Sequence, residues 1–369
     1  MEEKKFDVNS FIGMILIGGI LLWWMYSTKP EVDPNATTNT EQVTESTKED
    51  TSSTVNFSPT IESDSLKNAN LQNQLGAFAT SVINGTEGTT TLENDVLLLK
   101  INNKGGQIIE ALIKGYQTYD SLPLYMIKDN NASFNINFGT TDNRILNTKD
   151  LFFEPTFTNN GSSQVLSMKL KVSDNQFLEY RYEMTDDFMV NFAVRSQGLS
   201  NVINSSNPVN LDWSLKGYRH EKSLRTENTM YSYYYYKSDN EVDNLGLEDT
   251  DVVNDIDWVS YKQHFFSSIL LSDTPFNNAT IASVDLVKDE AIDSVFTKQY
   301  SLQTPLALKS GELNYDMKWY YGPSDYKKLS KYEGTDAGNL ANYYAGMAYL
   351  NTGKYDQAIS YLEKSHLLF

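Results

Sequence analysis

Few side chains in this sequence could carry acid–base chemistry. The chain has three histidines, and two of them, His220 and His264, lie in the segments RHEK and KQHFFSS. With Glu221, they could supply the histidine pair and carboxylate that proton transfer on a bound sugar requires. RHEK indicates a loop that follows a strand, whereas KQHFFSS is typical of a buried strand whose histidine is a hydrogen-bonded core residue. The sequence therefore favours a structural role for these residues, and we expect no enzyme.

The composition excludes several other kinds of site. No cysteine occurs in 369 residues, which excludes disulfides, thiolate catalysis and cysteine-ligated zinc or iron–sulfur centres. Asp and Glu outnumber Lys and Arg by 48 to 30, and the net charge is −18. Nucleic acid is not an expected partner, because phosphate binding needs clustered cations. With so few histidines, we expect no metal site and no cofactor.

Apolar residues alternate with polar ones from about residue 92 to residue 322. The alternating sets are Phe134, Ile136 and Phe138; Leu178, Tyr180, Tyr182 and Met184; Phe188, Val190, Phe192 and Val194; Val209, Leu211, Trp213 and Leu215; and Leu313, Tyr315, Met317, Trp319 and Tyr321. Turn sequences such as DNNAS and NNGSS separate them. This period of two with regular turns predicts a mainly β fold, a large antiparallel sandwich or barrel.

The tyrosine-rich segment MYSYYYYKSD (residues 230–239) allows two interpretations. It could be a strand with rings on both faces, or a stacking platform for a sugar or an apolar ligand. Tyrosine is a good strand former, so the strand is the preferred interpretation.

An uncharged stretch, residues 8–28, is long enough to cross a bilayer as a helix. The residues expected to form this membrane anchor include Phe11, Ile15, Leu16, Leu21, Trp23, Trp24 and Tyr26. The run ends in bulky side chains rather than in a small-residue cleavage site, which favours an uncleaved anchor over a signal peptide. Lys4 and Lys5 precede it, so the N-terminus is expected in the cytoplasm and the bulk of the chain on the other side of the membrane.

Composition divides the rest of the chain. Residues 29–60 are rich in Thr, Ser, Glu and Asn and predict a disordered polar tether. Residues 61–332 are expected to form the β-sandwich domain with short N- and C-terminal helices. The first of these helices would carry Leu66, Leu71, Leu75 and Phe78 along one side.

The C-terminal residues 333–369 have a different, helical pattern. They resemble one incomplete tetratricopeptide repeat, with Gly346 and Ala358 where two helices would approach closely and helices over residues 337–351 and 355–368. Three interpretations are open: a helical hairpin docked on the β domain, a partner-binding repeat, or the joining of the preceding sequence to part of an unrelated repeat protein, as a natural fusion or as an error in the sequence. The third interpretation fits the pattern best.

Three segments identify a family resemblance: INNKGGQIIEALIKGYQTYD, WVSYKQHFFSSILL and MKWYYGP. Together with the N-terminal apolar run, they resemble the YidC-type bacterial membrane protein insertase in its Bacteroidota form, over about residues 1–325. The motif residues are Gly105, Gly106, Trp258, Gln263, His264, Phe265, Phe266, Gly322 and Pro323. The glycines Gly105 and Gly106 suit a turn or bulge between strands. The aromatic motif of Trp258, Phe265 and Phe266 suits a strand buried on both faces, and Pro323 would end the last strand.

The resemblance implies that residues 61–332 form a periplasmic β-super-sandwich domain, and that the protein has a role in the insertion and folding of inner-membrane proteins. It also implies contacts with the inner membrane, the secretion channel and nascent membrane proteins. The five-helix membrane core of the family has no counterpart here, so we expect this chain alone to be inactive in insertion. The alternative is a membrane-tethered module that binds a glycan or a peptide.

Overall fold

The computed structural model describes residues 64–161, 163–239, 241–324, 342–343, 345 and 354–364. The predicted anchor (residues 8–28) and tether (residues 29–60) lie outside these residues. Within the described residues, no helix is both long and apolar enough to cross a membrane.

Short helical elements flank and interrupt a fold made mostly of strands. They are α2 (Asp64–Leu75), η1 (Gly76–Phe78), α3 (Ala79–Ile83), η2 (Thr148–Asp150), α4 (Leu224–Thr226), the π-helical turn η3 (Glu227–Tyr231) and α7 (Tyr355–Lys364). The predicted N-terminal helix is confirmed, although only Phe78 of its four apolar residues is fully buried, and Leu66 is exposed.

The strands form three sheets in which every neighbouring pair is antiparallel. A four-stranded sheet has the order β1 (Thr89–Glu93), β2 (Leu97–Asn102), β3 (Ile108–Gln117), β4 (Pro123–Ile127). A nine-stranded sheet has the order β13 (Glu241–Leu245), β12 (Ser232–Ser238), β15 (Ile256–Gln263), β16 (Phe266–Phe276), β19 (Asn314–Pro323), β10 (Met189–Gln197), β9 (Gln176–Met184), β8 (Gln164–Ser173), β7 (Glu154–Asn159). A six-stranded sheet has the order β14 (Asp249–Val253), β17 (Ala279–Asp285), β18 (Phe296–Leu306), β11 (Val209–Tyr218), β5 (Ala132–Gly139), β6 (Ile145–Asn147).

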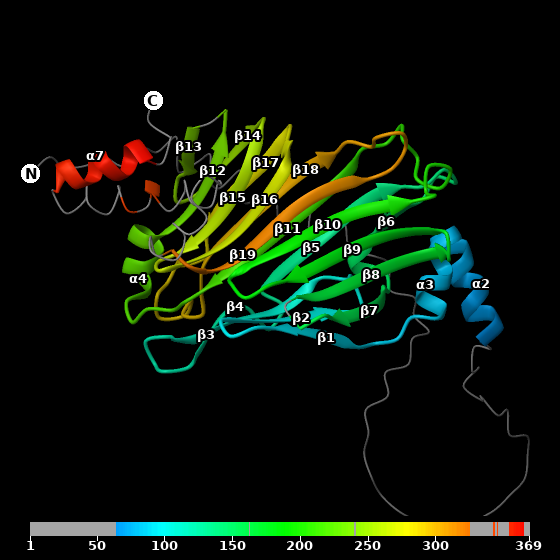
Figure 1. Ribbon diagram of the computed structural model, residues 1–369, viewed down its shortest axis with the longest axis horizontal. Helices are drawn as coiled ribbons and strands as arrows, with labels where there is room; N and C mark the ends of the chain where they lie inside the picture. The colour runs from blue at the N-terminus through cyan, green and yellow to red at the C-terminus, as the bar shows by residue number, and fades with distance from the viewer. Residues whose placement is uncertain are drawn as a thin grey trace, which may run out of the picture. The chain divides into compact units, whose positions relative to one another are not determined.

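The nine-stranded and six-stranded sheets pack face to face through an aromatic core. Trp213 of β11 stacks on Tyr261 of β15 with 3.9 Å between ring centroids, and Phe134 of β5 meets Phe192 of β10 edge to face at 5.5 Å. Figure 1 shows α2 and α3 at one end of the sandwich and α4 at the other. The predicted antiparallel β-sandwich is confirmed.

The predicted alternation places the expected residues in this core. Tyr180 and Tyr182 of β9 and Trp319 and Tyr321 of β19 are each at most 2% exposed. Successive side chains of a strand point to opposite faces, so a period of two in the sequence becomes one buried face. The tyrosine-rich segment is the strand β12, with Tyr234 and Tyr236 buried and Tyr233 and Tyr235 half-buried.

The aromatic motif around Trp258 differs from its prediction. It forms a hairpin of two strands, β15 and β16, rather than one strand buried on both faces. His264 lies in the turn with φ of +50°, and Phe265 beside it is 58% exposed. Trp258 and Phe266 are buried as expected. The predictions of a core histidine at 264 and a buried Phe265 are therefore wrong, because the chain reverses between Gln263 and Phe266 without a glycine or asparagine to signal it.

The glycine pair between β2 and β3 forms the turn that the sequence predicts. Gly105 and Gly106 have φ of +82° and +62°, in the left-handed region that side chains disfavour. The Gly106 carbonyl accepts a hydrogen bond from the Tyr182 hydroxyl at 2.8 Å. A Cβ at Gly106 would also lie 3.0 Å from the Phe153 ring. The turn therefore needs glycine for both its backbone angle and its packing.

We expect Gly106→Ala to lower the free energy of unfolding by about 2 kcal/mol, because strain in the left-handed region adds to crowding against Phe153. Gly115→Ala is the matched control, since Gly115 has φ of +78° but nothing within 4 Å of its added Cβ. It should cost only the backbone strain, about 1 kcal/mol. Urea unfolding of the chain in detergent micelles measures both; equal losses would contradict the packing role.

The C-terminal segment touches the sandwich at β12. The ring of Tyr343 lies 6.0 Å from that of Tyr235, edge to face. The predicted second helix of the tail includes α7, in which Ala358 and Leu362 are buried. The predicted first helix and Gly346 lie outside the described residues, apart from residues 342, 343 and 345, so the repeat resemblance and the predicted domain boundaries stay predictions.

Candidate functional site

A pocket of about 430 Å³ opens at the end of the sandwich that carries α4. Its lining comes from three regions far apart in the sequence: residues 118–129 around the β3–β4 loop, the end of β11 with the residues after it, and the loop before β18. The volume lies in the range of small-ligand sites. This pocket is the strongest candidate for a binding site among the described residues.

Hydrogen bonds to backbone carbonyls join these three regions. The amide of Tyr119 donates to the carbonyl of His220, and the amide of Arg219 donates to the carbonyl of Val295, both at 2.9 Å. The hydroxyl of Tyr218 donates to the carbonyl of Lys128 at 2.9 Å. The walls are therefore fixed to one another, and the pocket is largely formed before any ligand arrives.

Two cations line the pocket, each above a tyrosine ring. The Arg219 guanidinium lies 4.8 Å from the centroid of Tyr119, and Nζ of Lys128 lies 4.8 Å from that of Tyr125. Cation–π contacts of this kind hold a charged group without neutralising it. Arg219 also donates to the carbonyls of Glu221 and Lys222.

His220 lies in the wall of this pocket and is 3% exposed. Its Nε2 is 3.2 Å from the carbonyl oxygen of Tyr125, and its Nδ1 has no partner among the described residues. Burial lowers the pKa of His220 to about 4, because desolvation disfavours the charged ring. The ring is therefore neutral at pH 7. His220 also lies in a loop after β11, as the sequence predicts.

The stability of the fold should depend on this histidine below pH 7. Unfolded His220 binds a proton near pH 6.5, whereas the folded residue resists protonation down to about pH 4. The contribution of the neutral His220 ring to folding stability is thus fully present above pH 6.5 and is lost as the pH falls from 6.5 to about 4. We expect the difference in unfolding free energy between the natural chain and His220→Gln to change by about 3 kcal/mol from pH 7 to pH 4. Urea titrations at each pH measure it, and a flat difference would contradict a neutral buried ring.

His264 and Glu221 form a second, more open arrangement. Nδ1 of His264 lies 3.0 Å from Oε1 of Glu221, in an ion-pair contact rather than a well-aligned hydrogen bond. The His264 ring stacks between Tyr231, at 4.2 Å, and Phe265, at 3.6 Å. Burial lowers the pKa of His264 and the Glu221 carboxylate opposes that shift. Neither residue lines the pocket.

Glu227 is the residue that the sequence analysis missed. It is fully buried, and its carboxylate accepts hydrogen bonds from the amides of His220 and Glu221, both at 3.0 Å. Burial raises the pKa of Glu227 to about 7, although these two hydrogen bonds act in the opposite direction. Nothing in the segment SLRTEN distinguishes this glutamate from one on a surface helix.

The three predicted acid–base residues, His220, His264 and Glu221, are therefore neighbours but are not directed at one ligand. His220 lines the pocket with Nε2 against a carbonyl, and the buried Glu227 carboxylate is engaged by backbone amides. Glu221 pairs with His264 at the β15–β16 turn. A general acid or base must reach the proton that it transfers. This geometry supports a structural role for the cluster.

The other motif residues hold together the strands at the end of the sandwich that carries the pocket. Gln263 is buried and its Nε2 donates to the Tyr218 carbonyl at 3.1 Å. Phe266 packs against Tyr116 with ring centroids 5.2 Å apart. Gly322 packs against Phe188 and Tyr320, where a Cβ would lie 2.8 Å from their rings, and β19 ends at Pro323 as predicted.

A family profile described as the YidC periplasmic domain matches residues 89–349. That range covers more than two thirds of the chain. The chain belongs to the YidC family. The match includes most of the β domain and extends into the segment for which a repeat-like hairpin is predicted.

Curated relatives agree with this assignment. The membrane protein insertase YidC of Parabacteroides distasonis is 29% identical over 344 residues, covering 89% of this chain and 53% of that protein. The YidC of Porphyromonas gingivalis ATCC 33277 is 30% identical over 340 residues, with the same coverage. The chain thus spans about half the length of the curated relatives that it matches.

Two solved structures align with part of this chain. An active YidC insertase with its first transmembrane domain resolved aligns with a TM-score of 0.35 and 8% identity over 74% of this chain and 53% of that one. A putative aldose 1-epimerase from Escherichia coli K12 aligns with a TM-score of 0.40 and 10% identity over 64% of this chain and 99% of that one.

Proposed function

We propose that this chain serves a YidC insertase as the accessory domain on the outer face of the inner membrane, and that it is not an enzyme. Its match to the YidC periplasmic domain carries the proposal. In this role the sandwich assists insertion and folding by contacting nascent membrane proteins and the secretion channel. The insertion step itself is assigned to the part of an insertase that this chain does not match, since the chain spans about half the length of its curated relatives.

The proposed topology is a single crossing by residues 8–28. Lys4 and Lys5 remain in the cytoplasm and the β domain lies in the periplasm. The chain has no cysteine, so single cysteines report the topology directly. A membrane-impermeant maleimide added to spheroplasts should label Thr38→Cys and should not label Glu2→Cys. The reverse pattern would overturn the orientation.

A domain exchange tests the accessory role. In the Parabacteroides distasonis insertase, residues 61–324 of this chain would replace the matching region, and the chimera would be expressed in cells depleted of their own insertase. We expect the chimera to restore growth and this chain alone to fail. A chimera that accumulates in the membrane but does not restore growth contradicts the proposal, as does rescue by this chain alone.

The pocket favours one second candidate function, a membrane-tethered module that binds a glycan or a peptide. Tyr119, Tyr125 and Tyr218 line it and could stack on sugar or peptide groups. Screening of the chain in micelles against glycan and peptide arrays tests this function. Binding that Tyr125→Ala abolishes would favour it, and the absence of any bound glycan or peptide would reject it.

A further inference from the structure

The pocket beside Arg219 contains charges of both signs in an otherwise strongly acidic chain. Arg219 and Lys128 line it together with Asp120 and Asp129. Among the described residues, neither cation has a carboxylate within salt-bridge distance; each lies over a tyrosine ring instead. The carbonyls of Glu221 and Lys222 accept hydrogen bonds from Arg219 but do not neutralise its charge, so an external anion need not displace a carboxylate from either cation.

The rim of the pocket is apolar and open to solvent. Tyr119, Leu122 and Val295 are 47%, 58% and 53% exposed. Large apolar side chains that surround a charged pocket are costly in water and indicate a binding surface. The surface therefore offers apolar contacts around a polar centre, which is the arrangement found at membrane interfaces.

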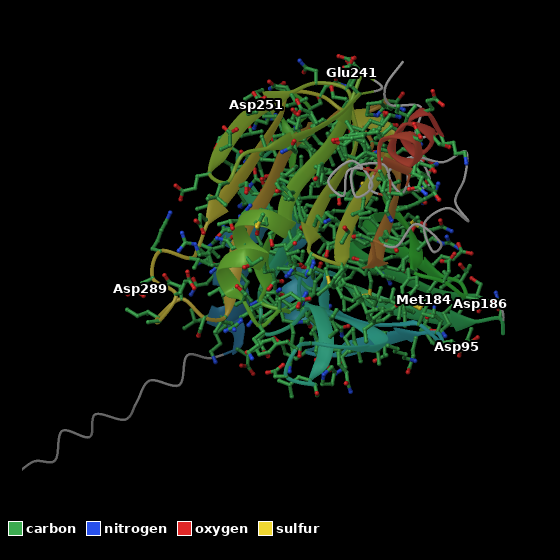
Figure 2. All side chains as sticks on the ribbon, turned by 90° about the vertical axis from the view of Figure 1, so that its left-hand side faces the viewer. Asp95, Met184, Asp186, Glu241, Asp251 and Asp289 are labelled. Atoms are coloured by element: carbon green, nitrogen blue, oxygen red, sulfur yellow. The ribbon has the colours of Figure 1, made fainter. Side chains whose placement is uncertain are left out.

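More exposed apolar residues lie at the same end of the sandwich. Met230 and Tyr231 of η3 and Phe265 of the β15–β16 turn are 59%, 39% and 58% exposed. The amide of His264 donates to the Tyr231 carbonyl at 3.0 Å, so the turn and η3 form one surface. Figure 2 looks onto this end, where the acidic Asp289 of the β17–β18 loop lies at the margin.

We propose that this pocket binds the phosphoethanolamine headgroup of a membrane lipid. Arg219 and Lys128 bind the phosphate, and Asp120 and Asp129 face the ammonium group. The charges of the site thus match both charges of a zwitterionic headgroup. The apolar rim then rests in the interfacial layer of the bilayer, and the end of the sandwich that carries α4 lies against the membrane.

This inference rests on the proposed membrane topology. If residues 29–60 form the tether that their composition predicts, a random coil of that length would span about 30 Å root-mean-square and would hold the sandwich near the bilayer at a high effective concentration. Weak binding of each headgroup is sufficient under these conditions. The same chemistry could come from a free phosphate ester or from a zwitterionic peptide, and the experiment separates these sources from a lipid.

The first measurement locates the surface in vesicles. The full chain, carrying either Leu122→Cys or Ile145→Cys with a bimane label, is reconstituted into vesicles of phosphatidylethanolamine and phosphatidylcholine that contain a headgroup nitroxide lipid. Ile145 is 72% exposed at the start of β6, near the end that carries α2, and is the matched control. We expect strong quenching at position 122 and little at position 145. Equal quenching, or none at position 122, would overturn the proposal.

The second measurement tests the pocket with soluble probes. Glycerophosphoethanolamine and inorganic phosphate are titrated onto the labelled Leu122→Cys chain in detergent micelles. We expect glycerophosphoethanolamine to bind, and we expect Lys128→Gln to weaken that binding about tenfold. Lys104→Gln, an exposed lysine outside the pocket, makes the same change in net charge and should have no effect. Arg219→Lys, which keeps the charge, should weaken binding less than Lys128→Gln.

The outcomes separate the sources. Inorganic phosphate that binds as tightly as glycerophosphoethanolamine would assign the pocket to a free anion, and binding of a short peptide without quenching in vesicles would assign it to a protein ligand; either result overturns the lipid site. The vesicle readout needs no insertion activity. Failure of the chimera would therefore leave a positive quenching result intact, and the two proposals can fail separately.

Discussion

Trp319→Ala should cause the largest loss of stability of any single substitution argued for this protein, about 3–5 kcal/mol. Trp319 lies in the middle of β19 and is 2% exposed. The centroid of its ring lies 4.9 Å from that of Trp213 and 5.7 Å from that of Phe134, both of which belong to the facing six-stranded sheet. Removing it leaves a cavity where the two large sheets join, and the rigid strands around it cannot close the gap.

Urea unfolding of the chain in micelles, followed by circular dichroism, measures this loss. Trp319→Phe keeps an aromatic ring and removes an indole N–H that has no partner among the described residues, so we expect it to cost less than half as much. Phe157→Ala, on the edge strand β7 and 46% exposed, should change stability by no more than about 0.5 kcal/mol. A loss below about 1 kcal/mol for Trp319→Ala would show that the sheets do not depend on this contact.

The position of Trp319 also shows why so much of the sandwich could be predicted. Side chains of a strand alternate between faces, so the run Leu313, Tyr315, Met317, Trp319 and Tyr321 predicts one buried face, and all five are buried. Pairing between strands is not encoded in this period. The neighbours of β19 are β10 and β16, whose partner residues Val190 and Leu270 are distant in the sequence.

The candidate site was less predictable for a related reason. Its wall combines residues from three loops, and only the pairing of the strands brings Tyr119, Arg219 and Val295 together. The turn at His264, where φ is +50°, was missed because apolar residues continue through it and no glycine or asparagine marks it. Glu227 was missed because its carboxylate accepts hydrogen bonds from the backbone amides of His220 and Glu221, and backbone amides carry no sequence signal.

The second large effect is expected for Glu227→Ala, which should cost about 3 kcal/mol near pH 5. The substitution leaves the amides of His220 and Glu221 without their acceptor in a buried site, and each unpaired amide costs about 1–3 kcal/mol. Because these amides belong to the loop behind the pocket, the loop should also lose protection against hydrogen exchange. Glu241→Ala, on the exposed part of β13, is the control and should have almost no effect.

The pH dependence of this loss tests why the carboxyl group is tolerated in the core. Burial raises the pKa of Glu227 from 4.5 to about 7, so its stabilising contribution is fully present below pH 4.5 and is lost as the pH rises through 7. The stability gap between the natural chain and Glu227→Ala should therefore narrow by about 2–3 kcal/mol between pH 5 and pH 8.5. A gap that widens instead would mean that the folded carboxyl group is ionised, and that its hydrogen bonds to the two amides outweigh the cost of burying the charge.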